Sequence, residues 1–186
     1  MGIFAPRKGL NVLFEAVVLA RKRCENPQDI QLTLIGGGKT GGVEQWSTDE
    51  VAAMATAAGL DPGSVEFTGY LSDPEELQRR YRAAGALVHP SFREGFPRVI
   101  DEAMLNGLPV IAAAIPQISQ VLRAGEDALL ATPRSAESLA DCIFRLLDDF
   151  TLYDRLARGA AARERVLRGE SAAQQHLRLL QGSATD

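Results

Sequence analysis

The sequence predicts an α/β fold: a doubly wound, Rossmann-like parallel sheet with helices on both faces. Short apolar runs alternate with amphipathic stretches almost throughout the chain. Strands that alternate with helices imply right-handed crossovers and a parallel sheet covered on both sides. The 186 residues are enough for one sizeable domain and short for two. We therefore expect a Rossmann-like domain over residues 1–150 and a helical tail over 151–186 that belongs to the same domain.

The expected strands are the short apolar runs, and each is followed by a turn or a helical pattern. The first run, "GIFA", has no approach segment, so we expect the sequence to be part of a longer protein. An amphipathic stretch from Leu10 to Cys24 follows it, and Ser47 with Glu50 forms a capping box before a helix that ends near Gly59. The expected strands cover 2–5, 30–35, 64–69, 86–90, 109–112 and 128–132, and further helices cover 73–83, 97–106 and the chain from 135 onward, broken near Gly169.

Composition excludes several classes of protein. The net charge of −4 argues against nucleic-acid binding, which needs a basic patch. No apolar run approaches the ~18 residues that span a bilayer. Cys24 and Cys142 lie far apart without metal-ligand spacing, which is typical of reduced cysteines in a cytoplasmic protein. We expect a cytoplasmic protein that binds no nucleic acid and no metal.

Ligands of such sheets bind outside the carboxyl ends of the strands. The loops expected at this edge are 5–9, 36–46, 69–73, 89–97 and 113–117.

The glycine cluster "LIGGGKTGG" (34–42) resembles two phosphate-binding patterns. A P-loop would need a glycine where Thr33 stands and a helix that starts at Lys39. A dinucleotide fingerprint would need a helix at once and an acid at the end of the next strand, whereas Glu66 lies in mid-strand. We expect a flexible loop in which glycine lets a ligand approach the backbone, with an oxidoreductase as the less favoured alternative.

The stretch "PSFREGFPRVIDEAMLNGLPVIA" (90–112) places Glu94 before a helix start and Glu102 inside that helix. Pro97 suits the first helical position, which leaves the next three amides as unpaired donors for an anion such as phosphate. Glu102 lies one turn after Arg98 and suits the vicinal hydroxyls of a ribose. Glu94 suits a second polyol. One acid at each end of a diphosphate describes a nucleotide sugar. The alternatives are a solvated loop acid for Glu94 and an arginine partner for Glu102.

The same stretch closely resembles the signature of retaining GT-B glycosyltransferases of the family-4 type, in which two glutamates are separated by seven residues. The resemblance extends to "PRKGLNVLFEAV", "LTLIGGG", "VEFTGYL" and "AGALVHPS". It corresponds to the C-terminal, donor-binding half of these enzymes and not to the N-terminal acceptor-binding domain.

The resemblance implies roles for individual residues. Glu94 and Lys8 form the catalytic set: Glu94 contacts the donor sugar, and Lys8 neutralises the diphosphate. Glu102 holds the ribose. The remaining substrate-binding residues are Gly95 and Phe96 near the sugar, Arg98 and Val99 at the β-phosphate, Gly36 and Gly38 beside the nucleotide, Tyr70 and Leu71 at the base, and Arg7 and Ser91. An alternative for Arg7 and Lys8 is a solvated turn.

The sequence departs from the family pattern at two places. Ile3 stands where the family usually has an arginine, for which Arg7 is the nearest substitute. Pro116 and Gln117 stand where the family tends to have a pair of glycines, and Gln120 stands where it has a glutamate, so the pattern does not fix the donor sugar or transfer itself. His89 follows a strand directly, and we expect a structural role for it.

We therefore expect the donor-binding part of a metal-independent glycosyltransferase that uses a UDP- or GDP-type sugar as substrate and no cofactor. Its partner is the acceptor-binding domain of the same enzyme, and any peripheral membrane contact belongs to that half. The alternative in another class is a binding module without transferase activity.

Overall fold

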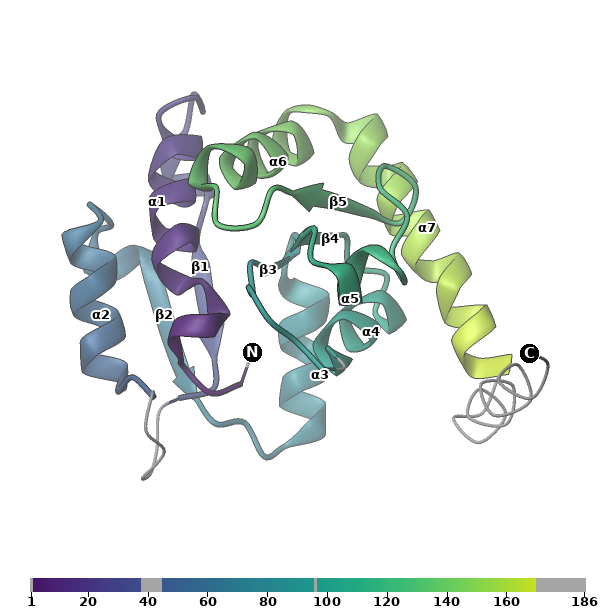
Figure 1. The fold of residues 1–186 in the computed structure, drawn as a ribbon, viewed down its shortest axis with the longest axis horizontal. Helices are drawn as coiled ribbons and strands as arrows, with labels where there is room; N and C mark the ends of the chain where they lie inside the picture. Colours follow the sequence, from purple (N-terminus) through teal and green to yellow (C-terminus); the bar gives the residue numbers. More distant parts are fainter. Residues whose placement is uncertain (1, 38–44, 96, 170–186) are drawn as a thin grey trace, which may run out of the picture.

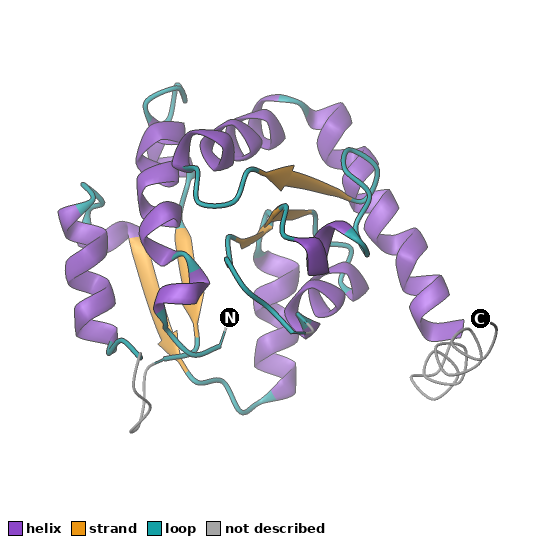
Figure 2. Ribbon diagram, in the orientation of Figure 1, coloured by secondary structure: helices purple, strands orange, loops and turns teal. Residues whose placement is uncertain are grey.

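The computed structural model describes residues 2–37, 45–95 and 97–169, with side chains up to residue 162. The strands fall into two parallel sheets (Figures 1 and 2). One sheet pairs β1 (Leu32–Ile35) with β2 (Val65–Gly69). The other has the order β3-β4-β5, formed by Leu87–His89, Val110–Ala113 and Ala128–Ala131.

Helices connect the strands, as parallel pairing requires. In Figure 1, α6 lies above β5. It contacts α1, and α4 contacts α7. The helices are α1 (Leu10–Arg21), α2 (Thr48–Ala57), α3 (Pro74–Ala83), α4 (Arg98–Leu105), α5 (Pro116–Ser119), α6 (Ala136–Asp148) and α7 (Phe150–Gly169), with 3-10 turns at Pro6–Lys8, Pro27–Asp29 and Pro62–Ser64.

Strand β4 divides the core into two layers. All four of its residues are buried. Ile111 packs in the cluster of α1 and α6, whereas Val110 and Ala112 pack in the cluster of α4 and α5. Alternate residues of a strand face opposite sides, so this single strand anchors a helical layer on each face.

Local capping agrees with the sequence. The Ser47 side chain accepts from the Glu50 amide, and the Glu50 carboxylate accepts from the Ser47 amide, as the capping box predicted. Asp73 caps α3 through the Glu75 amide at 2.9 Å. Helix α4 packs through one face, on which Ile100, Ala103 and Met104 are all buried.

Three expectations of secondary structure are wrong. Residues 2–5 form no strand: Gly2 makes one isolated bridge to Gly36, and the chain then enters the turn at Pro6–Lys8. The single expected sheet is divided, because no ladder joins β1 to β3 in the described residues. Pro97 is the N-cap of α4 and not its first residue, because its ψ of 72° lies outside the helical range.

Two further findings bear on the exclusions made from sequence. Cys24 and Cys142 are both free thiols. Among the described residues, no helix combines the length and apolar character needed to cross a membrane.

Helix α7 approaches the turn before β5 closely at Gly159. A Cβ atom at this position would lie 2.2 Å from the Glu126 carbonyl oxygen. In a helix without such a contact, Gly→Ala stabilises by about 1 kcal/mol. Here we expect Gly159→Ala to lower the free energy of unfolding by about 1–3 kcal/mol, because the backbone at Glu126 or the helix itself must move to admit the methyl group. Urea denaturation measures this change.

Gly63→Ala is the matched control, since nothing lies within 4 Å of its added Cβ. We expect this change to stay within about 0.5 kcal/mol of the parent protein. Stabilisation by Gly159→Ala would show that α7 does not pack against this turn.

Candidate functional site

Two segments distant in sequence meet at the carboxyl end of β3. They are the turn Pro6–Lys8 and the loop that follows His89. The Phe92 amide donates to the Arg7 carbonyl oxygen at 2.8 Å, which ties the two backbones together. The Arg134 guanidinium lies 4.8 Å from the centre of the Phe92 ring and packs on it.

Gly9 makes this approach sterically feasible. Its φ is +68°, in the left-handed region, and an added Cβ would lie 2.4 Å from the Pro90 carbonyl oxygen. A side chain at Gly9 would therefore push the turn away from the loop. The residue beside it, Lys8, is in this way held against the loop after β3.

The turn and the loop bring Lys8 and Glu94 into contact. Lys8 Nζ donates to Glu94 Oε1 at 2.6 Å, and the two side chains are only 18% and 10% exposed. Neither residue is therefore solvated, and the alternatives of a solvated loop acid and a solvated turn are wrong for this pair. Lysine has three N–H donors, of which this contact uses one.

His89 and Ser91 lie behind this ion pair and are buried, at 4% and 1% exposure. His89 Nε2 is 3.2 Å from Glu94 Oε1. Within the described residues, His89 Nε2 and Ser91 Oγ satisfy no hydrogen-bond geometry with a protein atom. Both side chains nevertheless lie close enough to Glu94 to favour the charged form of its carboxyl.

Glu94 is held as a carboxylate. Burial by itself would raise the pKa of its carboxyl, but the polar groups of His89, Lys8 and Ser91 around it outweigh burial and hold the pKa well below its ordinary value. Glu94 is therefore ionised at neutral pH. A permanent carboxylate accepts hydrogen bonds and stabilises positive charge, but it has no proton to donate.

Glu102 has a partner that sequence reasoning missed. Tyr81 of α3 donates its hydroxyl to Glu102 Oε2 at 2.9 Å, in place of the arginine considered as an alternative. Burial, followed by this contact, raises the pKa of Tyr81. The available signal was the aromatic Tyr81 in a helix rich in charged residues, because a buried tyrosine hydroxyl usually finds a hydrogen-bond partner.

The start of α4 differs from expectation in its donors. The Ile100 amide donates to the Pro97 carbonyl oxygen at 2.9 Å, so it is not an unpaired donor. That the amides of Arg98 and Val99 donate to a phosphate stays a prediction. These two amides belong to the first turn of an eight-residue helix, at the positive end of its dipole.

The other predicted site residues have the following places. An added Cβ at Gly36 would lie 2.1 Å from the Gly2 carbonyl oxygen, so the protein's own backbone occupies the space that this glycine leaves. Four of the others are exposed: Arg7, Tyr70 (86%), Gly95 and Arg98, and an added Cβ at Gly95 would meet open space. Leu71 and Val99 are half-buried. Phe96 and Gly38 lie outside the described residues.

The places where the sequence departs from the family pattern are all exposed. Ile3 is 44% exposed and lines the cavity beside the site. Pro116 is the first residue of α5, and Gln120 follows that helix.

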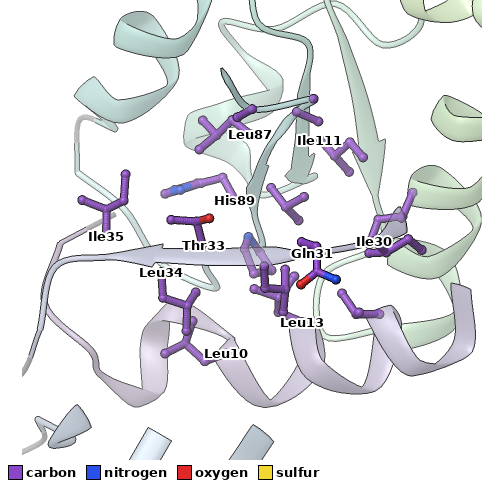
Figure 3. Close-up of a pocket in the computed structure, with 18 of the residues that line it drawn as sticks. Leu10, Leu13, Ile30, Gln31, Thr33, Leu34, Ile35, Leu87, His89 and Ile111 are labelled. Atoms are coloured by element: carbon purple, nitrogen blue, oxygen red, sulfur yellow. The ribbon is translucent and has the colours of Figure 1, made fainter. Parts of the chain in front are cut away.

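A cavity of about 450 Å³ adjoins the site (Figure 3). Lys8, His89 and Ser91 line one part of it, and most other lining residues are apolar. Glu94 and Glu102 are not among its lining residues.

Two findings concern acidic side chains outside the Lys8–Glu94 pair. Glu66, the acid considered for a dinucleotide site, is bound by Arg80 Nη1 at 2.7 Å. No three His, Cys, Asp or Glu side chains in the described part of the chain gather as a metal site would require.

His89 makes the stability of the fold depend on pH. Burial, only partly offset by Glu94, lowers the pKa of its imidazole in the folded protein. A lowered pKa means that stability is complete above the unfolded value of about 6.5 and is lost as the pH falls toward the folded value. We expect the free energy of unfolding, measured in urea, to fall between pH 7 and pH 5.5, and His89→Gln to make this fall shallower.

His176→Gln removes the other histidine and is the matched control, expected to keep the full dependence on pH. The carboxyl of Glu94 does not interfere, because its lowered pKa affects stability only below about pH 4.5. An unchanged slope in His89→Gln would show that the imidazole is not held neutral by burial.

The comparisons with known proteins agree on one family. The family model described as Glycosyl transferases group 1 matches residues 1–149. D-inositol 3-phosphate glycosyltransferase from Nocardioides sp. is 32% identical over 182 residues, which is 95% of this chain and 39% of that protein. The chain thus spans about two fifths of the length of this relative.

Solved structures agree with the family model. The C-terminal domain of a glycosyl transferase group 1 family protein, LpcC from Francisella tularensis, has a TM-score of 0.72 at 27% identity and covers 86% of this chain and 79% of that one. Anabaena HepE in complex with UDP has a TM-score of 0.73 at 28% identity, covering 98% and 48%. HepE has also been solved in complex with UDP-glucose.

Family model, relatives and fold therefore confirm the resemblance seen in the sequence: the chain belongs to the group 1 glycosyltransferases and has the α/β fold of the C-terminal domain of GT-B enzymes.

Proposed function

We propose that this chain is the nucleotide-sugar-binding domain of a retaining glycosyltransferase, which transfers a sugar from a UDP- or GDP-type donor to an acceptor. The observation that carries the proposal is the buried cluster of Lys8, Glu94 and His89 at the carboxyl edge of the sheet. A cation and an ionised acid, both mostly shielded from water, suit a donor with a negative diphosphate and a hydroxyl-rich sugar.

Lys8 and the start of α4 supply the charge that the leaving group needs. Departure of a nucleoside diphosphate leaves about two negative charges, and fixed cations and amides stabilise such charge strongly in a shielded site. The two remaining N–H donors of Lys8 are available to phosphate oxygens. The amides of Arg98 and Val99 supply the second contact, and we propose that transfer needs no metal ion.

Glu94 acts on the sugar. Transfer from such a donor passes through a state with positive charge on the sugar ring. Because the pKa of Glu94 is held low, its carboxylate accepts from a sugar hydroxyl and stabilises that charge, while it donates no proton. The acceptor site belongs to another domain, so we expect this chain alone to bind donor without transferring its sugar.

The bound states of HepE favour UDP over GDP as the first nucleotide to test. The exposed Ile3 favours a second candidate, a binding module without transferase activity, because an apolar residue there adds no second cation. A full-length protein that binds donor but never releases nucleoside diphosphate would support this second candidate.

The role of Lys8 is tested by diphosphate binding. We expect Lys8→Ala to lower the affinity for UDP by about 10- to 100-fold, because a charge-assisted contact to phosphate is lost. Isothermal titration calorimetry measures this affinity. Uridine, which has no phosphate, should bind both proteins equally.

Lys22→Ala is the matched control, since it removes an exposed lysine at the end of α1. Equal loss of UDP and uridine affinity in Lys8→Ala would indicate a general disturbance and contradict the phosphate role. Binding of NAD in preference to UDP would contradict the donor class altogether.

The role of Glu102 is tested by removing the ribose hydroxyls. Glu102→Gln keeps an acceptor for Tyr81 but loses the charge, so we expect UDP to bind about 10-fold more weakly. The 2′,3′-dideoxy analogue of UDP should bind the parent and the variant equally. Glu15→Gln, an exposed acid on α1, is the control. If the analogue loses as much affinity as UDP does, Glu102 does not hold the ribose.

A further inference from the structure

Arg134 has an unusual backbone conformation in the turn between β5 and α6. Its φ is +63°, and among the described residues it is the one residue other than glycine with a positive φ. A side chain in this left-handed region crowds the backbone, so glycine or asparagine usually stands there. Arg134 is exposed, and the N-cap of α6 is the next residue, Ser135. Neither burial in the core nor capping of α6 therefore accounts for an arginine at this position.

The Arg134 side chain lies on an aromatic ring of another loop. Its guanidinium carbon is 4.8 Å from the centre of the Phe92 ring. This is within the ~6 Å range of a cation–π contact. In the described part of the chain, Arg134 makes no ion pair and no side-chain hydrogen bond. The interaction that accompanies the strained backbone is therefore the stack on Phe92.

Phe92 contacts the residues on both sides of Lys8. Its amide donates to the Arg7 carbonyl oxygen at 2.8 Å. On the other side, a Cβ added at Gly9 would lie 3.0 Å from Cε1 of the Phe92 ring, so the ring lies directly against this glycine. Phe92 is half-buried and packs against the core that α1 and α6 share. A shift of Phe92 would therefore shift the backbone that carries Lys8.

The loop that carries Phe92 also carries the partner of Lys8. Glu94 follows Phe92 by two residues, and its Oε1 accepts from Lys8 Nζ at 2.6 Å. A binding group keeps its productive geometry, within about 0.5 Å, only when neighbouring side chains fix it in place. Arg134 and Phe92 are placed to give this support from outside the ion pair.

We propose that Arg134 is a positioning residue for Lys8. Its guanidinium covers the Phe92 ring and holds the ring against Gly9. The turn Pro6–Lys8 then stays at the distance from the loop that the contact of Lys8 with Glu94 needs. Arg134 itself does not touch the donor. The inference rests on the proposed function, because it is observed through the diphosphate that Lys8 binds.

The test compares the stability of the fold with the affinity for UDP. Asparagine tolerates the left-handed region and lacks the guanidinium, so we expect Arg134→Asn to unfold within about 3 °C of the parent. We expect this variant to bind UDP about 3- to 10-fold more weakly, measured by isothermal titration calorimetry, and to bind uridine unchanged. Arg134→Gly, which also suits the left-handed region, should show the same loss.

Arg145→Asn is the matched control, because it removes an exposed arginine from the last turn of the same helix, α6. We expect it to keep the affinity for UDP. A lower unfolding temperature of Arg134→Asn, together with an equal loss of UDP and uridine affinity, would show a general structural role and overturn the proposal. Unchanged affinity for UDP in Arg134→Asn would overturn it too.

A double-mutant cycle shows whether Arg134 acts through Lys8. We expect Arg134→Asn to weaken UDP binding in the parent and to change nothing further in Lys8→Ala, because the group that Arg134 positions is then absent. Equal losses in the two backgrounds would mean that Arg134 acts on UDP independently of Lys8, and would overturn the proposal while the proposed function stands. A Lys8→Ala variant that binds UDP as tightly as the parent would overturn the proposed role of Lys8 and this inference with it.

Discussion

The ion pair between Lys8 and Glu94 is the interaction on which the rest of the site depends. It joins residues that are 86 positions apart, and both side chains are largely shielded from water. Charges in such a place are costly unless they are paired and hydrogen-bonded, and loss of one partner from a buried pair typically costs about 3–5 kcal/mol. The pair persists because Gly9 lets the turn Pro6–Lys8 lie against Pro90, and because the Phe92 amide binds the Arg7 carbonyl oxygen.

The same packing fixes the protonation states at the site. Burial opposes charge on His89, while the groups around Glu94 favour charge on its carboxylate. A neutral imidazole therefore stands beside a permanent carboxylate and a lysine. This arrangement is compatible with the proposed donor, which carries a negative diphosphate and a hydroxyl-rich sugar. The second acid, Glu102, is held separately by Tyr81 across α3 and α4.

Local features of the sequence predicted local features of the structure. The capping box at Ser47 and Glu50 and the helix over Pro74–Ala83 both follow from short-range patterns. The divided sheet did not follow, because the pattern of apolar runs shows that strands exist but not which edges remain unpaired. Pro97 lies one position before the helix because proline fixes only φ. Its ψ is set by the surrounding loop, which the local sequence does not determine.

The sequence was enough to name candidate site residues, but it did not predict which side chains they contact. Lys8, Glu94 and Glu102 were identified from motifs, whereas their partners come from elements distant in the chain. The contact of Lys8 with Glu94 depends on the left-handed Gly9, and that of Glu102 depends on how α3 packs against α4. The spacing of residues within one segment does not show how the turn at Lys8 packs against the loop at Glu94, or how α3 packs against α4.

A crystal structure of this chain with UDP tests the central assignment most directly. We expect the β-phosphate within hydrogen-bond distance of Lys8 Nζ and of the Arg98 and Val99 amides, with the ribose hydroxyls on Glu102. A nucleotide bound elsewhere, or one whose phosphates contact neither Lys8 nor the start of α4, would contradict the assignment.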